Sequence, residues 1–234
     1  MSVFSIKIQD FGMLFSDLIV AIACLFCYFN IKAKTNHIRT SKFQSYWSLF
    51  FLFESISFFI GGLAHGLVAN INGLLSILSW YLSIFGVLYF TLGVMIASLP
   101  KMAKKYSRIL VSCAIICAII TGVMNNFFVV ITYCFIYMFI IIYINLKNKI
   151  ISFKYARSKG ILIGTLLFIV ASIFFVLNIR LFSVQASVLS HIIIAIGIIC
   201  FGNGCCRTIL DEYQKSQTSL TENSNSKMFT DHAI

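Results

Sequence analysis

The sequence predicts an all-α membrane protein in which seven transmembrane helices form one bundle. Of the 234 residues, 60% are hydrophobic and only 11% are charged, a composition outside the range of soluble globular domains. Seven apolar stretches are long enough to cross a bilayer, which takes about 20 residues each. The basic residues fall mainly in short loops after alternate stretches, as they do on the cytoplasmic side of membrane proteins.

The predicted helices follow one another with short connections. They lie near residues 11–31, 43–68, 73–99, 109–124, 127–146, 160–179 and 186–205. The fourth and fifth meet at Asn125 and Asn126, which leaves room only for a tight turn. Short loops make successive helices antiparallel neighbours, so residues 1–210 are expected to form one membrane domain. The polar residues 211–234 have few apolar side chains to bury, which predicts a disordered cytoplasmic tail.

The distribution of basic residues predicts the orientation of the chain. Sixteen of the eighteen lie in the loops after the first, third and fifth helices or in the tail, and only Lys7 and Arg180 lie on the other side. This predicts an N-terminus outside and a C-terminus inside. Attraction to anionic lipid headgroups accounts for the net charge of +11. Because that charge is divided among short loops, membrane lipids are the expected partners and nucleic acid is not.

Three titratable side chains fall inside predicted spans at similar depths. Asp17 lies about 9 Å into the first helix and His191 about 8 Å into the last, at 1.5 Å per residue. His65 lies near the outer end of the second helix. A titratable group in hydrocarbon costs several kcal/mol unless a partner, a cavity or a metal compensates it. The three residues can therefore form one site if the first, second and seventh helices adjoin.

The second helix carries further polar residues on one face. Glu54, Ser57, Gly61 and His65 are spaced by three, four and four residues, which places them on the same side of a helix. Gly61 allows a close helix approach or leaves room for a substrate. Because no basic residue lies at the depth of Glu54, this acid is expected to be protonated or paired.

The set Asp17, His65 and His191 has two interpretations. Two histidines and an aspartate, completed by water, are a familiar ligand set for zinc, which would activate that water. Alternatively, the aspartate orients an imidazole in a hydrogen-bonded structural triad without metal, because polar groups often hold transmembrane helices together. Both interpretations stay open at the level of the sequence.

Seven spans, with Ser57 and His65 in the second helix and His191 in the last, resemble the CREST-type seven-helix membrane hydrolases. That superfamily includes the alkaline ceramidases and the progestin and adipoQ receptors. The resemblance covers the whole bundle but few positions. Those hydrolases place Ser and His one turn apart on the second helix and two His one turn apart on the seventh. Here Ser57 and His65 are two turns apart, and Asp17 would replace a missing third histidine.

Two functional hypotheses follow from these residues and from the resemblance. In the first, the protein is a metal-dependent hydrolase of lipid amides or esters. Asp17, His65 and His191 would bind zinc, Ser57 would position water or an oxyanion, and Glu54 would carry a proton or support a ligand. In the second, it is a non-enzymatic seven-helix receptor, small-solute carrier or assembly factor, and the Asp/His/His cluster is structural.

Overall fold

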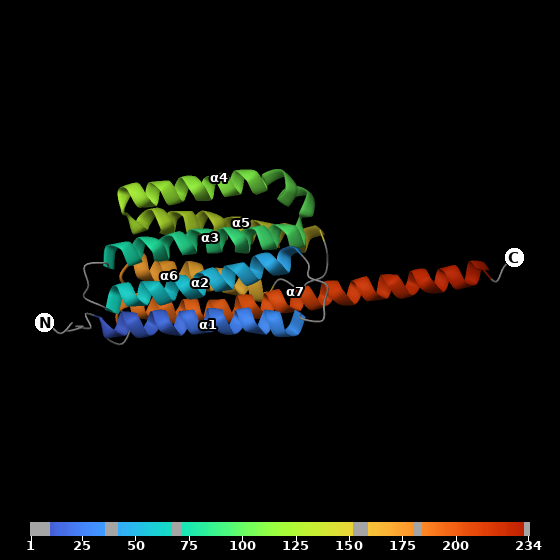
Figure 1. The fold of residues 1–234 in the computed structure, drawn as a ribbon, viewed down its shortest axis with the longest axis horizontal. Coiled ribbons are helices and arrows are strands. Elements are labelled where there is room, and N and C mark those ends of the chain that lie inside the picture. The colour runs from blue at the N-terminus through green and yellow to red at the C-terminus, as the bar shows by residue number, and fades with distance from the viewer. Residues whose placement is uncertain (1–9, 36–41, 67–71, 152–158, 180–183, 232–234) are drawn as a thin grey trace, which may run out of the picture.

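The described residues form seven α-helices that run alongside one another (Figure 1). The computed structural model describes residues 10–35, 42–66, 72–151, 159–179 and 184–231. The helices are α1 (Phe11–Thr35), α2 (Lys42–Gly66), α3 (Asn72–Ser98), α4 (Pro100–Met124), α5 (Phe127–Ile151), α6 (Lys159–Val176) and α7 (Ala186–Asp231). All seven are long and apolar enough to cross a membrane. Length and composition thus indicate a multi-pass membrane protein.

Helices that follow one another in the chain are also neighbours in space. Each packs against the next, and α1 also packs against α7, so that the first and last helices close one side of the bundle. Helix α2 touches α1, α3 and α7. The first, second and seventh helices therefore adjoin, which was the condition for their polar residues to share one site.

Several helix boundaries differ from the sequence prediction, most of all the start of α4 and the end of α7. Helix α4 begins at Pro100 rather than near residue 109, because proline is favourable at the first helical position and the basic residues after it are good helix formers. Helix α7 continues to Asp231 and projects beyond the bundle (Figure 1). The expectation of a disordered tail from residue 211 is corrected accordingly. No glycine or proline follows Gly204 to end the helix.

The turn between α4 and α5 has the conformation that its two asparagines favour. Asn125 ends α4 with φ 45° and ψ 47°, in the left-handed region that asparagine tolerates. The Asn126 side-chain oxygen accepts a hydrogen bond from the Phe128 backbone N–H at 2.9 Å, which satisfies a free donor at the start of α5. The predicted tight turn is confirmed.

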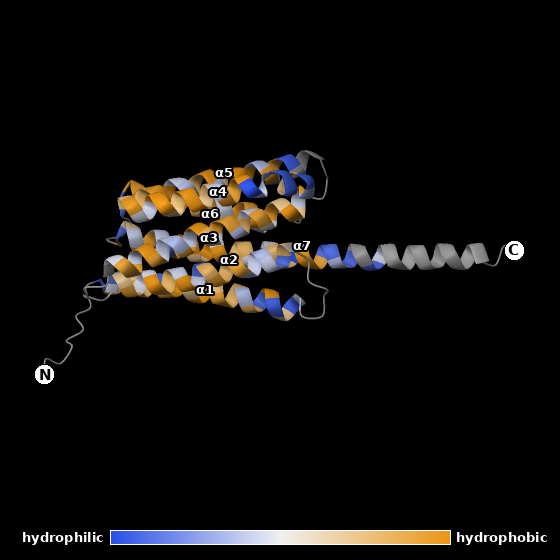
Figure 2. Ribbon diagram, turned by 45° about the horizontal axis from the view of Figure 1, so that its top comes forward, coloured by the Kyte–Doolittle hydropathy of each residue, from blue (hydrophilic) through white to orange (hydrophobic). Residues whose placement is uncertain are grey.

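Aromatic side chains form the centre of the packed core. Phe50, Phe90 and Phe201 are fully buried and come from α2, α3 and α7. Their ring centroids lie 4.6 Å apart for Phe50–Phe90 and 4.4 Å apart for Phe90–Phe201. Hydrophobic residues make up most of the bundle helices (Figure 2). Large apolar side chains are also exposed on the outside of the bundle, and on α4 along much of its length. Such a surface suits contact with lipid.

Helices α6 and α7 approach each other closely at glycines. A Cβ atom at Gly164 would lie 2.7 Å from the backbone oxygen of Gly197, and one at Gly204 would lie 2.7 Å from the backbone nitrogen of Ile161. Only glycine permits this backbone contact, as in other membrane helix pairs with small residues at their interface. The contact holds α6 against α7, next to the polar residues described below.

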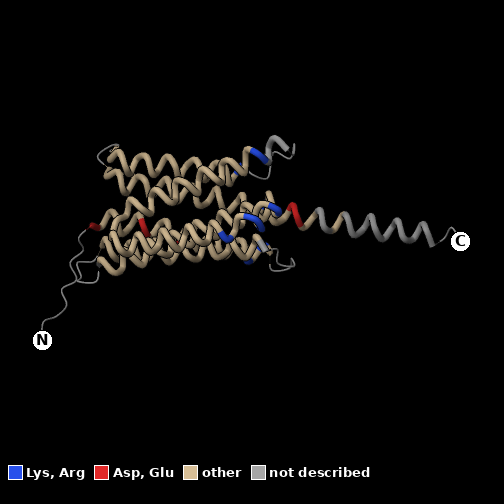
Figure 3. The backbone as a smooth tube through the Cα atoms, turned by 90° about the horizontal axis from the view of Figure 1, so that it is seen from above, with Lys and Arg blue, Asp and Glu red and all other residues tan. Residues whose placement is uncertain are grey.

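The described Lys and Arg residues gather toward one end of the bundle, the end from which α7 projects (Figure 3). This end contains the C-termini of α1, α3 and α5 and the N-termini of α2, α4 and α6. Lys7 and Arg180, the two predicted exceptions, lie outside the described residues. The described basic residues therefore share one end of the bundle, as the distribution of Lys and Arg in the sequence predicted.

The orientation can be checked with compartment-specific reporters. Fusions after Lys42, Asn72, Lys105, Asn126, Lys154 and Ser183 are expected to report in, out, in, out, in and out, because the basic end should stay cytoplasmic. A pair of consecutive fusions that reports the same side would contradict a seven-span arrangement.

Candidate functional site

The polar residues predicted from the sequence line one cavity between the helices. Its volume is about 370 Å³, and every helix except α4 contributes to its wall. All five predicted site residues are in that wall: Asp17, Glu54, Ser57, His65 and His191. Most of the remaining lining side chains are apolar or aromatic. The structure thus brings the predicted residues to one place, although it does not bring all of them into contact.

The predicted polar face of α2 is the face that lines the cavity. Glu54, Ser57, Gly61 and His65 all belong to its wall. Glu54 lies midway along α2, and His65 lies eleven residues further on, or about 16 Å at the helical rise. The wall therefore runs from mid-helix to the end opposite the basic residues. His65 is exposed there, and it marks where the cavity meets the surface.

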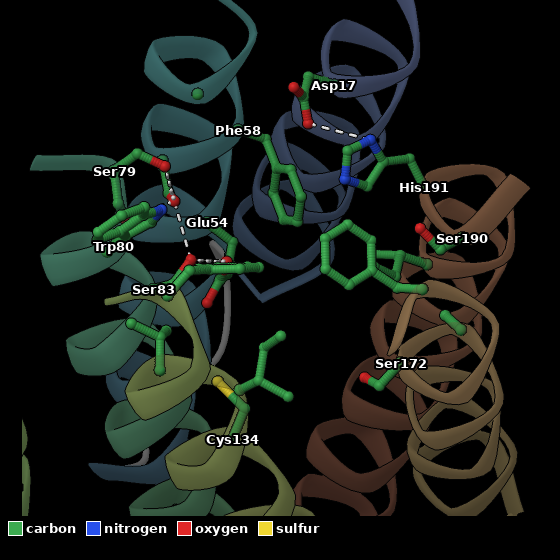
Figure 4. Close-up of a pocket in the computed structure, with 18 of the residues that line it drawn as sticks. Asp17, Glu54, Phe58, Ser79, Trp80, Ser83, Cys134, Ser172, Ser190 and His191 are labelled. Carbon is green, nitrogen blue, oxygen red and sulfur yellow. Dashed lines mark hydrogen bonds and ion pairs between the residues drawn. The ribbon is translucent and has the colours of Figure 1, made fainter. Parts of the chain in front are cut away.

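Asp17 and His191 form a contact between α1 and α7. The Asp17 Oδ1 atom lies 3.2 Å from the His191 Nδ1 atom (Figure 4), and the ring of His191 meets that of Phe58 edge-on, with the ring centroids 5.8 Å apart. The same Nδ1 lies 3.0 Å from the hydroxyl oxygen of Ser16. Asp17 is 3% exposed, and the imidazole compensates one of its two carboxyl oxygens. The other, Oδ2, has no partner among the described residues.

Hydrogen counting assigns the tautomer of His191. The single hydroxyl hydrogen of Ser16 goes to the carbonyl oxygen of Met13 at 3.0 Å, and an ionised Asp17 can only accept. A protonated Asp17 would instead donate to Nδ1. With Asp17 ionised, the hydrogen between these groups and His191 sits on Nδ1 of the imidazole. In the neutral ring this leaves the lone pair on Nε2, an atom that makes no hydrogen bond to a described residue. An Asp–His pair with a free Nε2 can act as a general base.

His65 does not complete a metal site with this pair. Among the described residues, no group of three His, Cys, Asp or Glu side chains is placed to hold a metal ion. Two of the three predicted zinc ligands, Asp17 and His191, are in contact, whereas His65 lines the cavity separately. These residues do not fit a three-ligand zinc site as they lie here, so no chemical step is assigned to a metal. Zinc binding stays a prediction from the sequence.

Glu54 belongs to a separate network between α2 and α3. The hydroxyl oxygen of Ser83 lies 3.1 Å from Glu54 Oε2, and the Ser57 hydroxyl donates to the carbonyl oxygen of Ser79 at 2.8 Å. The hydroxyl oxygens of Ser57 and Ser83 lie 2.8 Å apart. Glu54 is 3% exposed, and its Oε1 has no partner among the described residues. A Cβ atom at Gly86 would lie 2.6 Å from that oxygen, so only glycine leaves room for it.

This network is one hydrogen short when Glu54 is ionised. Its three closest contacts join Ser57 to the Ser79 carbonyl, Ser57 to Ser83, and Ser83 to Glu54. The hydroxyls of Ser57 and Ser83 supply only two hydrogens. A protonated Glu54 supplies the third and also avoids an uncompensated charge in the membrane. The sequence-based expectation of a neutral or paired Glu54 agrees with this count and stays a prediction.

Several residues of the site were not predicted from the sequence. Ser16, Ser79 and Ser83 hydrogen-bond to the predicted residues. Ser79 and Ser83 are four residues apart on one face of α3, which is a usable signal once a polar face on α2 is known. Trp80 on α3 also lines the cavity.

Comparison with known proteins places the chain in a family. Residues 13–208 match the model of a family of unknown function, DUF6962. The chain belongs to this family. The matched region begins in α1 and ends in α7, so it contains the whole cavity. No curated protein and no solved structure matches the chain. The resemblance to the CREST-type hydrolases stays a prediction.

The hydrogen count at Glu54 can be tested with two substitutions. Glu54→Gln supplies a permanent amide N–H toward Ser83, so the variant should insert and keep its thermal stability within about 1 kcal/mol of the parent. Glu54→Leu removes the polar partner and should cost about 1–3 kcal/mol, because the buried Ser83 hydroxyl loses that partner. The measurement is thermal unfolding in detergent. If Glu54→Gln abolishes stable insertion, Glu54 is a paired structural charge and the count is wrong.

Proposed function

We propose that the protein binds an amphipathic small molecule or lipid inside the membrane, in the cavity described above. The supporting observation is the cavity, about 370 Å³ in volume with mainly apolar walls. Ligand sites in proteins typically have apolar walls with a few convergent polar groups and volumes of about 300–1,000 Å³. Here those polar groups come from α1, α2, α3 and α7.

The polar groups lie at two levels, which favours a ligand with both polar and apolar parts. Asp17 packs against Gly62, where an added Cβ would lie 3.0 Å from the Asp17 Cβ. Gly62 is eight residues beyond Glu54 on α2, or about 12 Å along the helix. Aromatic and aliphatic side chains fill the wall at and between these levels, among them Phe58, Phe127 and Phe175. An alkyl chain suits this surface, and a polar head suits one of its two levels.

Filling the cavity should remove binding without altering the outer surface. Cys134 on α5 lines the cavity (Figure 4), whereas Cys113 on α4 is exposed. In lipid nanodiscs, a decanol analogue that carries a photoactivatable diazirine should label cavity peptides of the parent and of the control Cys113→Phe. Labelling of those peptides should fall at least fivefold in Cys134→Phe, because its ring occupies the space. Labelling of the lipid-facing surface of α4 should not change.

A second cavity variant keeps this test decisive. If Cys134→Phe does not fold, Ser172→Leu, on the α6 wall of the same cavity, replaces it. The proposal would be contradicted if the probe does not label cavity peptides of the parent. It would also be contradicted if a folded variant with a filled cavity is labelled as strongly as the parent.

Hydrolysis of a bound ester or amide is a second candidate, favoured by the free Nε2 of His191. Water would add across the scissile bond, and Nε2 would take its proton and pass it to the leaving oxygen or nitrogen. Asp17 would hold the ring by accepting from Nδ1, to which it lies 3.2 Å away. Ser57 and Glu54 would act at the next level of the cavity.

The hydrolase candidate predicts a dependence on His191. With decanoyl 4-methylumbelliferone and decanoyl 7-amino-4-methylcoumarin as substrates, His191→Ala should lower the rate of the parent about 10²–10⁴-fold, as loss of a general base does. The control Cys113→Phe should keep the full rate. An equal rate in the parent and His191→Ala would remove this candidate.

Elemental analysis of the same preparations distinguishes a zinc-dependent hydrolase from one in which the Asp–His pair acts without metal. The zinc site predicted from the sequence would be supported if the parent contains stoichiometric zinc and each single variant loses it, because a metal site fails when any ligand is removed. The variants are Asp17→Ala, His65→Ala and His191→Ala. Active protein that contains no zinc would support the Asp–His pair acting alone.

A further inference from the structure

Two acids line the cavity, and its described wall holds no permanently positive group. Asp17 and Glu54 line it, and neither a Lys nor an Arg is found among its described lining residues. Each acid is 3% exposed and has one carboxyl oxygen without a partner among the described residues. The imidazole of His191 already compensates Asp17. Glu54 has a hydroxyl as its nearest polar partner, at 3.1 Å, so a positive group inside the cavity has most to gain beside Glu54.

Aromatic rings lie on the same part of the wall. Trp80 stands beside Glu54 and Ser83 in the close-up (Figure 4). Its ring centroid is 5.5 Å from that of Phe127, which in turn lies 5.8 Å from that of Phe175 in an edge-on arrangement. All three rings line the cavity. The faces of aromatic rings attract ammonium groups, most strongly where water is excluded. A buried acid next to several rings is the combination that recognises an organic cation.

We propose that the ligand of this cavity is an alkylamine, whose ammonium head binds at Glu54 among Trp80, Ser57 and Ser83 and whose chain lies along the aromatic wall. This inference rests on the proposed function, since it names the ligand class of the same site. An ammonium group offers three donors to the carboxylate of Glu54 and the hydroxyls of Ser57 and Ser83, which all line the cavity. Its charge would stabilise the ionised form of Glu54, and the proton that this acid carries in the empty cavity would be released as the ammonium binds. A charged hydrogen bond in a buried site is stronger than a neutral one.

Other head groups fit this surface less well. A carboxylate or phosphate head would find no Lys or Arg among the described lining residues to neutralise its charge, and an unpaired buried charge is costly. An alcohol would find hydrogen bonds but would gain no charged partner, because Glu54 would stay protonated beside it. The alkylamine is the class that satisfies both the hydrogen bonds and the charge.

Competition with the neutral photoactivatable decanol analogue tests the ligand class. In nanodiscs of phosphatidylcholine, decylamine is expected to block cavity labelling at about one tenth of the concentration that decanol requires, or less, because a charged hydrogen bond adds to the same chain contacts. Decanoate should compete more weakly than decanol.

Two variants locate the head group. Glu54→Gln should reduce the advantage of decylamine over decanol to less than about twofold while decanol still competes. Cys113→Phe, on the exposed surface of α4, is the control and should keep the full advantage, and Asp17→Asn tests the other acid of the wall. If Glu54→Gln does not fold, Gly86→Ala, whose Cβ would lie 2.6 Å from Glu54 Oε1, displaces the same carboxyl group and should have the same effect.

The outcomes separate this inference from the function on which it rests. Equal competition by decylamine and decanol in the parent would overturn the alkylamine proposal and leave ligand binding intact. Loss of the advantage in Asp17→Asn but not in Glu54→Gln would overturn the placement at Glu54. Failure of every probe to label or compete at cavity peptides would overturn the binding function itself.

Discussion

The arrangement of this bundle depends on one physical constraint: a polar side chain between apolar helices must find a partner within the protein. Asp17 meets this constraint through His191, 3.2 Å away, and the contact joins the first helix to the last. Glu54 meets it through Ser83 on α3. The two contacts connect α1 to α7 and α2 to α3, so the polar residues help to determine which helices adjoin as well as to line the cavity.

Close packing elsewhere keeps the cavity open. On the basic side of Glu54, Phe50, Phe90 and Phe201 interlock and are fully buried. At the opposite wall, the glycines of α6 and α7 bring those backbones into contact. Well-packed interiors hold few voids larger than a water molecule. A cavity of about 370 Å³ between such tightly packed elements is therefore a specific feature of the fold, which supports a ligand as its purpose.

The sequence was sufficient to predict features that follow from apolar length and helical period. It predicted seven helices, the neighbouring positions of successive helices, and the common face of Glu54, Ser57, Gly61 and His65, all four of which line the cavity. It also placed Asp17 and His191 at the same depth, and the structure brings them into contact. Each of these features needs only the rise and periodicity of one helix at a time.

Features that depend on the rotation of one helix against another could not be predicted. The roles of Ser79, Ser83 and Trp80 follow from the rotation of α3 about its axis, which the sequence does not give. In the structure, the two serines face α2 and Trp80 lies in the cavity wall. The separation of His65 from Asp17 and His191 also depends on this geometry, because residues at a shared depth can still point in different directions. Depth was a good guide to which residues line the cavity and a poor guide to which of them touch.

The chemistry of the site therefore depends on the pairs that form, Asp17 with His191 and Glu54 with Ser83. Two separate pairs at two levels suit an extended amphipathic ligand better than a single metal centre.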